Sequence, residues 1–307
     1  MAKGGGAGTG GRGLSDLSVR NLFVFPTLLL LVALNVFPLV WSLGLSFTEY
    51  DASDPQTPPR FVGGENYGAA LADPDVFRAF HVTAGYVAAA VAIQFVLGFS
   101  LALLLNRPFR GRGLVVTLLL VPTMLSPIVV GLFSKLLLEP NYGLVNSALE
   151  ALGVASPPEW LTDPAWIWPS LVLVDTWQWT PFVMLLSLAG LSAIPPHLYE
   201  AAAIDRASGF FRFTRITLPL AGPLLLLAVL FRAVDAFKLF DLVMVLVGKD
   251  QALTQTLSIS LYLEAFASWN TGTASAMAYL VLVLVVALSN LTIRYLDRVS
   301  GGGGSAA

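Results

Sequence analysis

Long stretches without a charged residue constrain this 307-residue chain more than any other feature. An α-helix needs about 20 mainly apolar residues to cross a bilayer. Uncharged runs of that length cover residues 21–48, 79–106, 113–134, 176–199 and 265–293. A sixth apolar stretch, 219–247, contains four charges. The sequence therefore predicts an all-α integral membrane protein with six spans, at about 22–47, 80–105, 114–137, 165–192, 219–247 and 272–295.

Composition supports the same fold class and excludes several kinds of function. Charged residues make up 12% of the chain and apolar residues 56%, against about 25% and 45–50% in an average soluble domain. So few charges could not cover the surface of a soluble protein of this size. The chain has no cysteine and two histidines, which excludes thiolate chemistry and leaves too few ligands for a histidine-rich metal site. The net charge of −2 excludes a strongly basic nucleic-acid-binding protein.

Lysine and arginine are concentrated in one set of connecting segments. That set holds 11 of the 17 basic residues: Lys3, Arg12, Arg20, Arg107, Arg110, Arg112, Arg206, Arg212, Arg215, Arg294 and Arg298. Basic loops stay in the cytoplasm by the positive-inside rule, and an even number of spans places both termini on one side. We therefore expect a multi-pass protein of the cytoplasmic (inner) membrane with cytoplasmic N and C termini.

The expected transmembrane domain covers residues 21–298, and both ends of the chain lie outside it. Residues 1–20 include a glycine-rich segment and are expected to form a flexible cytoplasmic tail. Residues 299–307 resemble a Gly/Ser linker and are expected to form a flexible tail, either native or a linker scar.

The loop at about 193–219, between the fourth and fifth expected spans, carries the most specific motif. Its segment Tyr199–Ala207 is rich in alanine and predicts a short helix at the membrane surface. Glu200-Ala201-Ala202 is followed at fixed spacing by Ile216-Thr217-Leu218-Pro219. This pattern resembles the EAA loop of ABC-importer permeases of the carbohydrate-uptake branch, the maltose, trehalose and glycerol-phosphate type. Other segments between residues 20 and 298 are similar to that branch in the same order.

One position departs from the family pattern. The family glycine falls on Arg206, and Gly209 follows three residues later. Because arginine rarely adopts a positive φ, we expect the loop to turn at Gly209 and not to need a positive φ at position 206. Replacement of Arg206 by glycine is then expected to cost at most about 1 kcal/mol of local helix stability.

The resemblance implies a six-helix type I importer permease in which the loop contacts an ATPase subunit. The residues it assigns to this coupling are Tyr199, Glu200, Ala201, Ala202, Asp205, Gly209, Ile216, Leu218 and Pro219. The implied partners are a second homologous permease, two ATP-binding cassette subunits and an extracytoplasmic solute-binding protein. The chain lacks a GxxxxGK[ST] phosphate loop, so no cofactor is expected on it, and ATP and magnesium would bind the partner ATPase.

Charged and aromatic residues inside the expected spans indicate a pathway for solute. Asp175, Gln178, Trp179 and Phe182 follow the i, i+3, i+4, i+7 spacing of one helix face, and Arg232, Asp235, Ala236 and Leu239 do the same in the next span. Carboxylates, amides and rings suit a sugar, whose hydroxyl groups need hydrogen-bond partners and whose apolar face packs on a ring. In maltose-type members of the family, the spans that flank the EAA loop supply the substrate contacts. A purely structural neutralisation of these charges remains the alternative, above all for Lys238 and Asp241.

Asp175 is the odd charge in its span and requires a partner at a similar depth. If the fifth span leaves the membrane near Val247, Lys238 lies closest in depth to Asp175. Arg232 is the partner if that span is shifted by one turn, and a protonated Asp175 is the third possibility.

These observations favour a permease subunit of an ATP-driven ABC importer for a sugar, oligosaccharide or polyol that works by alternating access. The alternative is a stand-alone secondary transporter or channel that uses the intramembrane charges. It leaves the EAA spacing unexplained, and we find no inverted internal repeat of the kind such transporters carry. A membrane enzyme is disfavoured because no catalytic cluster or metal-ligand set is evident.

Overall fold

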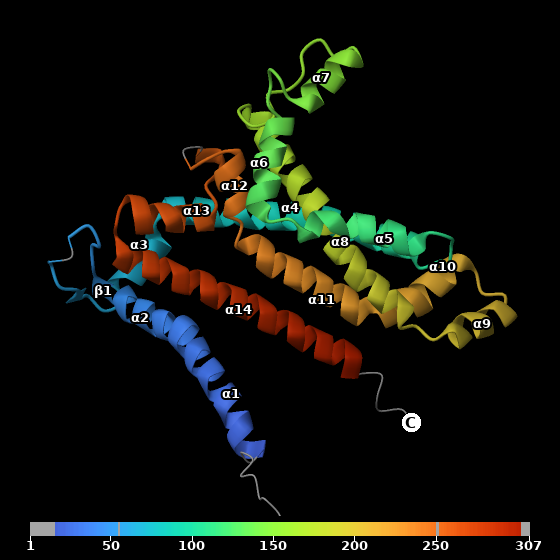
Figure 1. Cartoon of the computed structure of the whole chain (residues 1–307), viewed down its shortest axis with the longest axis horizontal. Coiled ribbons are helices and arrows are strands. Elements are labelled where there is room, and N and C mark those ends of the chain that lie inside the picture. The colour runs from blue at the N-terminus through green and yellow to red at the C-terminus, as the bar shows by residue number, and fades with distance from the viewer. Residues whose placement is uncertain (1–15, 55, 250–251, 302–307) are drawn as a thin grey trace, which may run out of the picture.

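The computed structural model describes residues 16–54, 56–249 and 252–301, and most of this length is helical (Figure 1). The spanning helices and their segments are α1 (Asp16–Leu31), η1 (Val32–Val36), α2 (Phe37–Ser46), α4 (Pro74–Leu105), α5 (Arg112–Leu120), η2 (Val121–Met124), α6 (Pro127–Leu137), α8 (Pro164–Ser192), α11 (Leu218–Phe237) and α14 (Thr271–Gly301). The shorter elements are β1 (Thr48–Glu49), β2 (Arg60–Phe61), α3 (Glu65–Ala72), α7 (Leu144–Ala151), α9 (Pro196–Ile204), α10 (Gly209–Arg212), η3 (Phe213–Thr217), α12 (Asp241–Leu246), η4 (Ala252–Thr254), α13 (Leu257–Tyr262) and η5 (Leu263–Ala267). β1 and β2 pair antiparallel.

Helices α4, α8 and α11 pack against one another and form the centre of the bundle (Figure 1). Two apolar clusters lie along them, one that includes Tyr86 and Leu171 and another that includes Phe99 and Met184. Both α4 and α8 begin with the same capping arrangement, an aspartate N-cap followed by proline at the first helical position. Asp73 accepts from the N–H of Asp75 at 2.8 Å, and Asp163 caps α8 in the same way. Aspartate caps and N-terminal prolines fix helix starts locally. Helix α8 begins within one residue of the expected start at 165, whereas α4 begins six residues before the expected start at 80.

Five helices of the described residues are long and apolar enough to cross a membrane, and a bent pair would make a sixth. The third expected span, at 114–137, is not one continuous helix. The helical segments Arg112–Met124 and Pro127–Leu137 meet at 94°, and α6 rises away from the bundle with α7 beyond it (Figure 1). Ser126 has extended backbone angles at the break, as expected for a residue that precedes proline.

The prediction of a continuous fifth span at 219–247 is also wrong. Helix α11 ends at Phe237, and α12 begins at Asp241 after a break. The hydroxyl of Thr256 donates to the carbonyl of Leu239, one of the groups at the break, at 3.2 Å. Lys238 therefore lies in the break and Asp241 begins the next helix, so neither continues the helix that carries Arg232 and Asp235.

Helix boundaries near the ends of the chain extend beyond those expected. α1 begins at Asp16 and α14 continues to Gly301, so short parts of both expected tails are helical. The rest of those tails, residues 1–15 and 302–307, lies outside the described residues.

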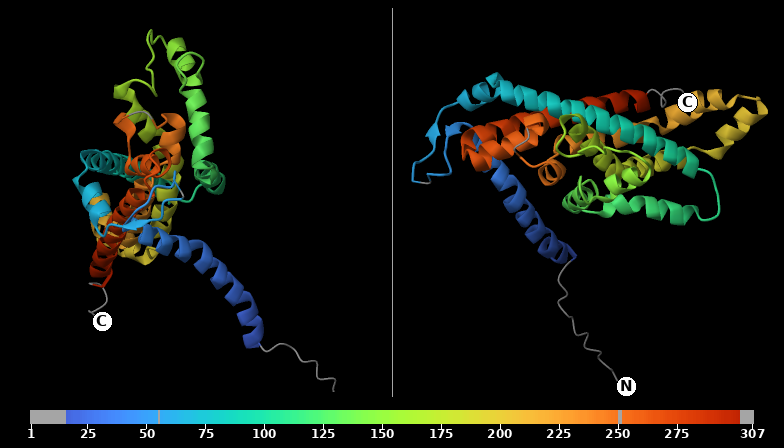
Figure 2. Two further views of the ribbon diagram at one scale, coloured as in Figure 1. Left: turned by 90° about the vertical axis from the view of Figure 1, so that its left-hand side faces the viewer. Right: turned by 90° about the horizontal axis from the view of Figure 1, so that it is seen from above.

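The first span is set apart from the rest of the molecule. It covers Leu22–Ser46, and none of its most apolar window is buried within the chain. Figure 2 shows that α1 diverges from the bundle, while α2 packs on α14. This arm leaves a long apolar surface for lipid or for another chain.

The close packing of α4 on α8 depends on Gly98. A Cβ atom at this position would lie 2.9 Å from both the Met184 nitrogen and the Val183 Cβ. We expect Gly98→Val to destabilise the protein by about 1–3 kcal/mol, the usual cost of overpacking, as measured by thermal unfolding in detergent. Gly85→Ala in the same helix is the control, because its Cβ would meet open space. Equal stability of the two variants would contradict this account of the helix contact.

Candidate functional site

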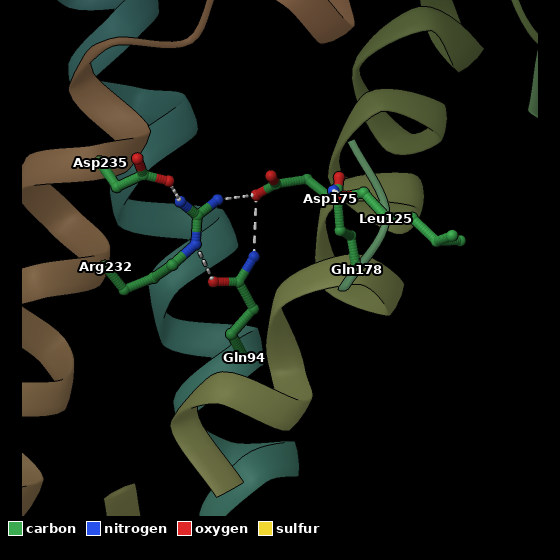
Figure 3. Close-up of polar contacts among 6 residues, drawn as sticks. All are labelled: Gln94, Leu125, Asp175, Gln178, Arg232 and Asp235. Atoms are coloured by element: carbon green, nitrogen blue, oxygen red, sulfur yellow. Dashed lines mark hydrogen bonds and ion pairs between the residues drawn. The ribbon is translucent and has the colours of Figure 1, made fainter. Parts of the chain in front are cut away.

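A buried polar network joins the three central helices (Figure 3). Arg232 of α11 donates from Nη2 to Asp175 Oδ2 of α8 at 2.5 Å and from Nη1 to Asp235 Oδ2 at 2.7 Å. Gln94 of α4 accepts from Arg232 Nε at 2.7 Å and donates to Asp175 Oδ2 at 2.8 Å. The side chains of Arg232 and Asp175 are 2% and 3% exposed, whereas that of Asp235 is 46% exposed. Two buried charges are thus neutralised by an ion pair, and the second carboxylate faces outward.

The partner of Asp175 is Arg232, the second of the two basic candidates that the sequence offered. Lys238, the first candidate, is exposed and lies beyond the end of α11. The depth estimate failed because it placed the end of the span near Val247, whereas the helix ends at Phe237. Measured from that end, Arg232 lies five residues inside the helix, about 7.5 Å at ~1.5 Å per residue, and Lys238 lies outside it.

A recess opens beside this network, with a volume of about 100 Å³. Every predicted pathway residue except Phe182 lines it: Asp175, Gln178, Trp179, Arg232, Asp235, Ala236 and Leu239. Lys238 and Asp241, which were not assigned to the pathway, line it as well. The Arg232 guanidinium carbon lies 5.0 Å from the centroid of a Trp179 ring, a cation–π contact. Gln178 is fixed by donation from Nε2 to the Leu125 carbonyl at 3.1 Å (Figure 3).

Phe182 is the one predicted pathway residue that does not line the recess. It packs edge-on against Trp179, with ring centroids 6.2 Å apart. Phe182 therefore supports the ring that borders the recess. The two helix faces expected from the spacing do converge on one place.

Sequence reasoning missed Gln94, which contacts both members of the buried ion pair. The available signal was a polar amide inside the uncharged run 79–106, since polar residues at membrane depth are commonly functional. That signal identifies the residue but not its partners, which lie in two other helices far along the chain.

The loop between α8 and α11 forms a compact helical unit at one end of the bundle (Figure 1). Tyr199, Glu200, Ala201 and Ala202 lie on α9, and Leu218 and Pro219 begin α11. The Tyr199 hydroxyl and Thr217 Oγ1 lie 2.9 Å apart, which fixes α9 to the start of α11. Glu200 is exposed and Ala202 is buried.

A groove of about 550 Å³ runs along this helical unit. Its lining includes Ala201, Ala202, Asp205 and Ile216 of the predicted coupling residues. The groove therefore gives this side of the loop a concave surface that fits a protruding segment of another protein.

Known proteins with the same architecture identify the family. A family model described as "Binding-protein-dependent transport system inner membrane component" matches residues 60–299. The chain belongs to this family. The permease is 38% identical over 281 residues to the trehalose/maltose transport system permease protein MalF of Thermococcus litoralis, with 92% of this chain and 93% of that protein covered.

Two further comparisons agree with this assignment. The trehalose transport system permease protein SugA of Mycobacterium tuberculosis is 33% identical, with 96% of this chain and 94% of that protein covered. The fold matches a chain in the crystal structure of a bacterial ABC transporter involved in the import of the acidic polysaccharide alginate. That match has a TM-score of 0.76 at 22% identity, and covers 91% of this chain and 96% of the other. The predicted family and type I permease fold are confirmed.

The permease turns the loop between α8 and α11 at Arg206, not at Gly209 as expected. Arg206 has a φ of 52°, whereas Gly209 is the first residue of α10 and has no positive φ. The N–H of Ala207 donates to the carbonyl of Ala202 at 2.9 Å, and the N–H of Arg206 donates to that of Ala203 at 3.1 Å. These are the two bonds of a Schellman motif, whose left-handed position is normally glycine. Arginine thus occupies the glycine position without changing the turn.

This geometry reverses the expected effect of Arg206→Gly. Glycine relieves a left-handed conformation that costs an ordinary residue about 1–2 kcal/mol, so the variant is expected to be more stable by about 1 kcal/mol. Thermal unfolding of the purified permease measures the change. Ala203→Gly within α9 is the control and should be destabilised by about 1 kcal/mol. A loss of stability in Arg206→Gly would show that the arginine side chain makes a contact worth more than the backbone strain.

Proposed function

We propose that this permease imports a sugar, oligosaccharide or polyol as one subunit of an ATP-driven ABC importer. Its relative MalF is a trehalose/maltose transport system permease, and SugA is a trehalose transport system permease. The imported solute of this permease is then a related polyhydroxylated compound.

The recess beside Asp175 is the single observation that carries this proposal. It combines carboxylates that accept hydrogen bonds, the amide of Gln178 and the ring of Trp179 at the place where α8 and α11 meet. Hydroxyl groups of a sugar can form hydrogen bonds with the carboxylates and the Gln178 amide. The apolar face of the sugar ring packs on the Trp179 ring.

The recess is too small to be a complete site. Its volume of about 100 Å³ compares with about 300–1,000 Å³ for small-molecule pockets. A second, homologous permease completes the pathway in this proposal. The unburied arm of α1 and α2 supports the existence of such a partner, since a span that leaves its own bundle can pack against another.

The remaining partners bind at the two ends of the bundle. Two ATPase subunits dock on the α9–α10 unit, where Glu200 is exposed, and hold the ATP and magnesium. This end is cytoplasmic, with both termini, because Arg206, Arg212 and Arg215 lie there. A solute-binding protein delivers solute at the opposite end.

Alternating access follows from the connections of the coupling unit. Closure of the ATPases on ATP moves α9, and the bond between Tyr199 and Thr217 passes that movement to the start of α11. Because α11 is joined to α8 and α4 through Arg232, the three helices move together and change the side on which the recess opens.

The test is to purify the complex with its ATPase and measure ATP hydrolysis while solutes are added with the partner binding protein. Stimulation by a neutral sugar or polyol supports the proposal. Stimulation only by amino acids or peptides contradicts the solute class. Uptake that depends on an ion gradient, with no ATPase bound, would favour a secondary transporter instead.

A further inference from the structure

We propose that the recess discriminates by charge, accepts neutral polyhydroxylated solutes and rejects anionic ones. This inference rests on the proposed function and settles a point it leaves open. The fold alone does not fix the charge of the solute, because the protein whose structure matches at a TM-score of 0.76 is involved in the import of an acidic polysaccharide.

An anionic solute would be expected to bind the guanidinium of Arg232, but all three nitrogens of this group already donate hydrogen bonds to side chains of the permease. Nε, Nη1 and Nη2 donate to Gln94, Asp235 and Asp175 respectively. A Trp179 ring covers one face at 5.0 Å. With the side chain 2% exposed, a carboxylate or phosphate of the solute could reach it only by displacing a carboxylate of the protein.

Gln94 is the positioning residue of this arrangement. Its amide accepts from Arg232 and donates to Asp175, so both members of the ion pair are held in one orientation. The amide carries no charge, and it fixes the arginine without adding to the field in the recess.

The charges that line the recess sum to −1. They comprise three carboxylates, Asp175, Asp235 and Asp241, and two cations, Arg232 and Lys238. The Asp235 side chain is 46% exposed and uses Oδ2 for Arg232. A solute therefore meets an accessible carboxylate, which accepts hydrogen bonds from hydroxyl groups and repels another anion.

Lys238 lines the recess with a positive charge that opposes the negative charge of Asp235. It is exposed and lines the same recess three residues after Asp235. Neutralising Asp235 and neutralising Lys238 should therefore change the preference of the recess in opposite directions. Damage to the structure alone would lower the binding of every solute together and would not produce this pair of opposite changes.

The experiment measures equilibrium binding to the assembled complex in nanodiscs without the binding protein, so that only the permease pathway selects. The probes are radiolabelled maltose and trehalose, each paired with an analogue in which one CH₂OH group is oxidised to a carboxylate. We expect the neutral member to bind at least tenfold more tightly. Asp235→Asn should reduce this preference at least threefold, and Lys238→Gln should increase it.

Asp75→Asn is the matched control, because Asp75 also pairs with an arginine three residues away, Arg78, but outside the recess. It should leave the preference unchanged. Equal or tighter binding of the carboxylate analogues to the wild-type complex overturns the inference, as does an unchanged preference in both recess variants. If none of the four probes binds a complex whose ATP hydrolysis a neutral sugar stimulates, the recess is not where solute is selected, and the inference is overturned while the proposed function stands.

Discussion

Replacing Arg232 with methionine is expected to destabilise the permease by about 3–5 kcal/mol, the typical cost of removing one partner of a buried ion pair. The side chain of Asp175, which is 3% exposed in the native protein, would lose its cation and keep the amide of Gln94 as a hydrogen-bond donor. Unfolding of the detergent-purified protein, followed by tryptophan fluorescence, measures the loss.

A double-mutant cycle isolates the pair. Asp175→Asn in the Arg232→Met background is expected to recover part of the stability, since the second change removes the uncompensated charge. Lys238→Met is the control: its side chain is exposed, so it should cost little and show no coupling to Asp175→Asn. Coupling to Lys238 and none to Arg232 would contradict the observed pairing.

Replacing Glu200 with alanine or lysine is expected to lower transport and solute-stimulated ATP hydrolysis at least tenfold. The carboxylate is exposed on α9, beside the groove that we propose as the ATPase contact. Stability should change by less than about 0.5 kcal/mol, as for other exposed positions.

The control for Glu200 is Glu150→Ala, which removes an exposed glutamate from the short helix α7 at a distance from the coupling unit (Figure 1). That variant should retain stimulation of the ATPase. Normal transport by both Glu200 variants would contradict its role in coupling. Loss of transport with a complex that no longer co-purifies would place the effect in assembly.

The sequence alone was sufficient for the features that depend on nearby residues. Uncharged runs identified the spans because apolar length is a property of a continuous segment. The spacing of Asp175, Gln178 and Trp179 predicted a common helix face, and all three line the recess. The EAA pattern located the loop that we propose as the ATPase contact for the same reason: its residues are close in the chain.

Some errors had a local signal that was not used. Pro127 forces the preceding Ser126 into an extended conformation, so the bend in the third span could have been anticipated. Glycine at the Arg206 position in related permeases marked a left-handed residue, and the structure keeps that backbone with arginine in its place. In both cases one residue adopts a non-helical backbone conformation, extended at Ser126 and left-handed at Arg206, although the sequence around it favours a helix.

The tertiary structure alone decided which polar groups meet across the helices. Arg232 rather than Lys238 contacts Asp175, because α11 ends at Phe237 and Lys238 lies beyond its end. No residue in that segment predicts where the helix breaks. Gln94 joins the pair only because α4 packs closely on α8 and α11. The physical reason is that hydrophobic length sets whether a helix spans the membrane, whereas its depth and rotation are set by packing against neighbours.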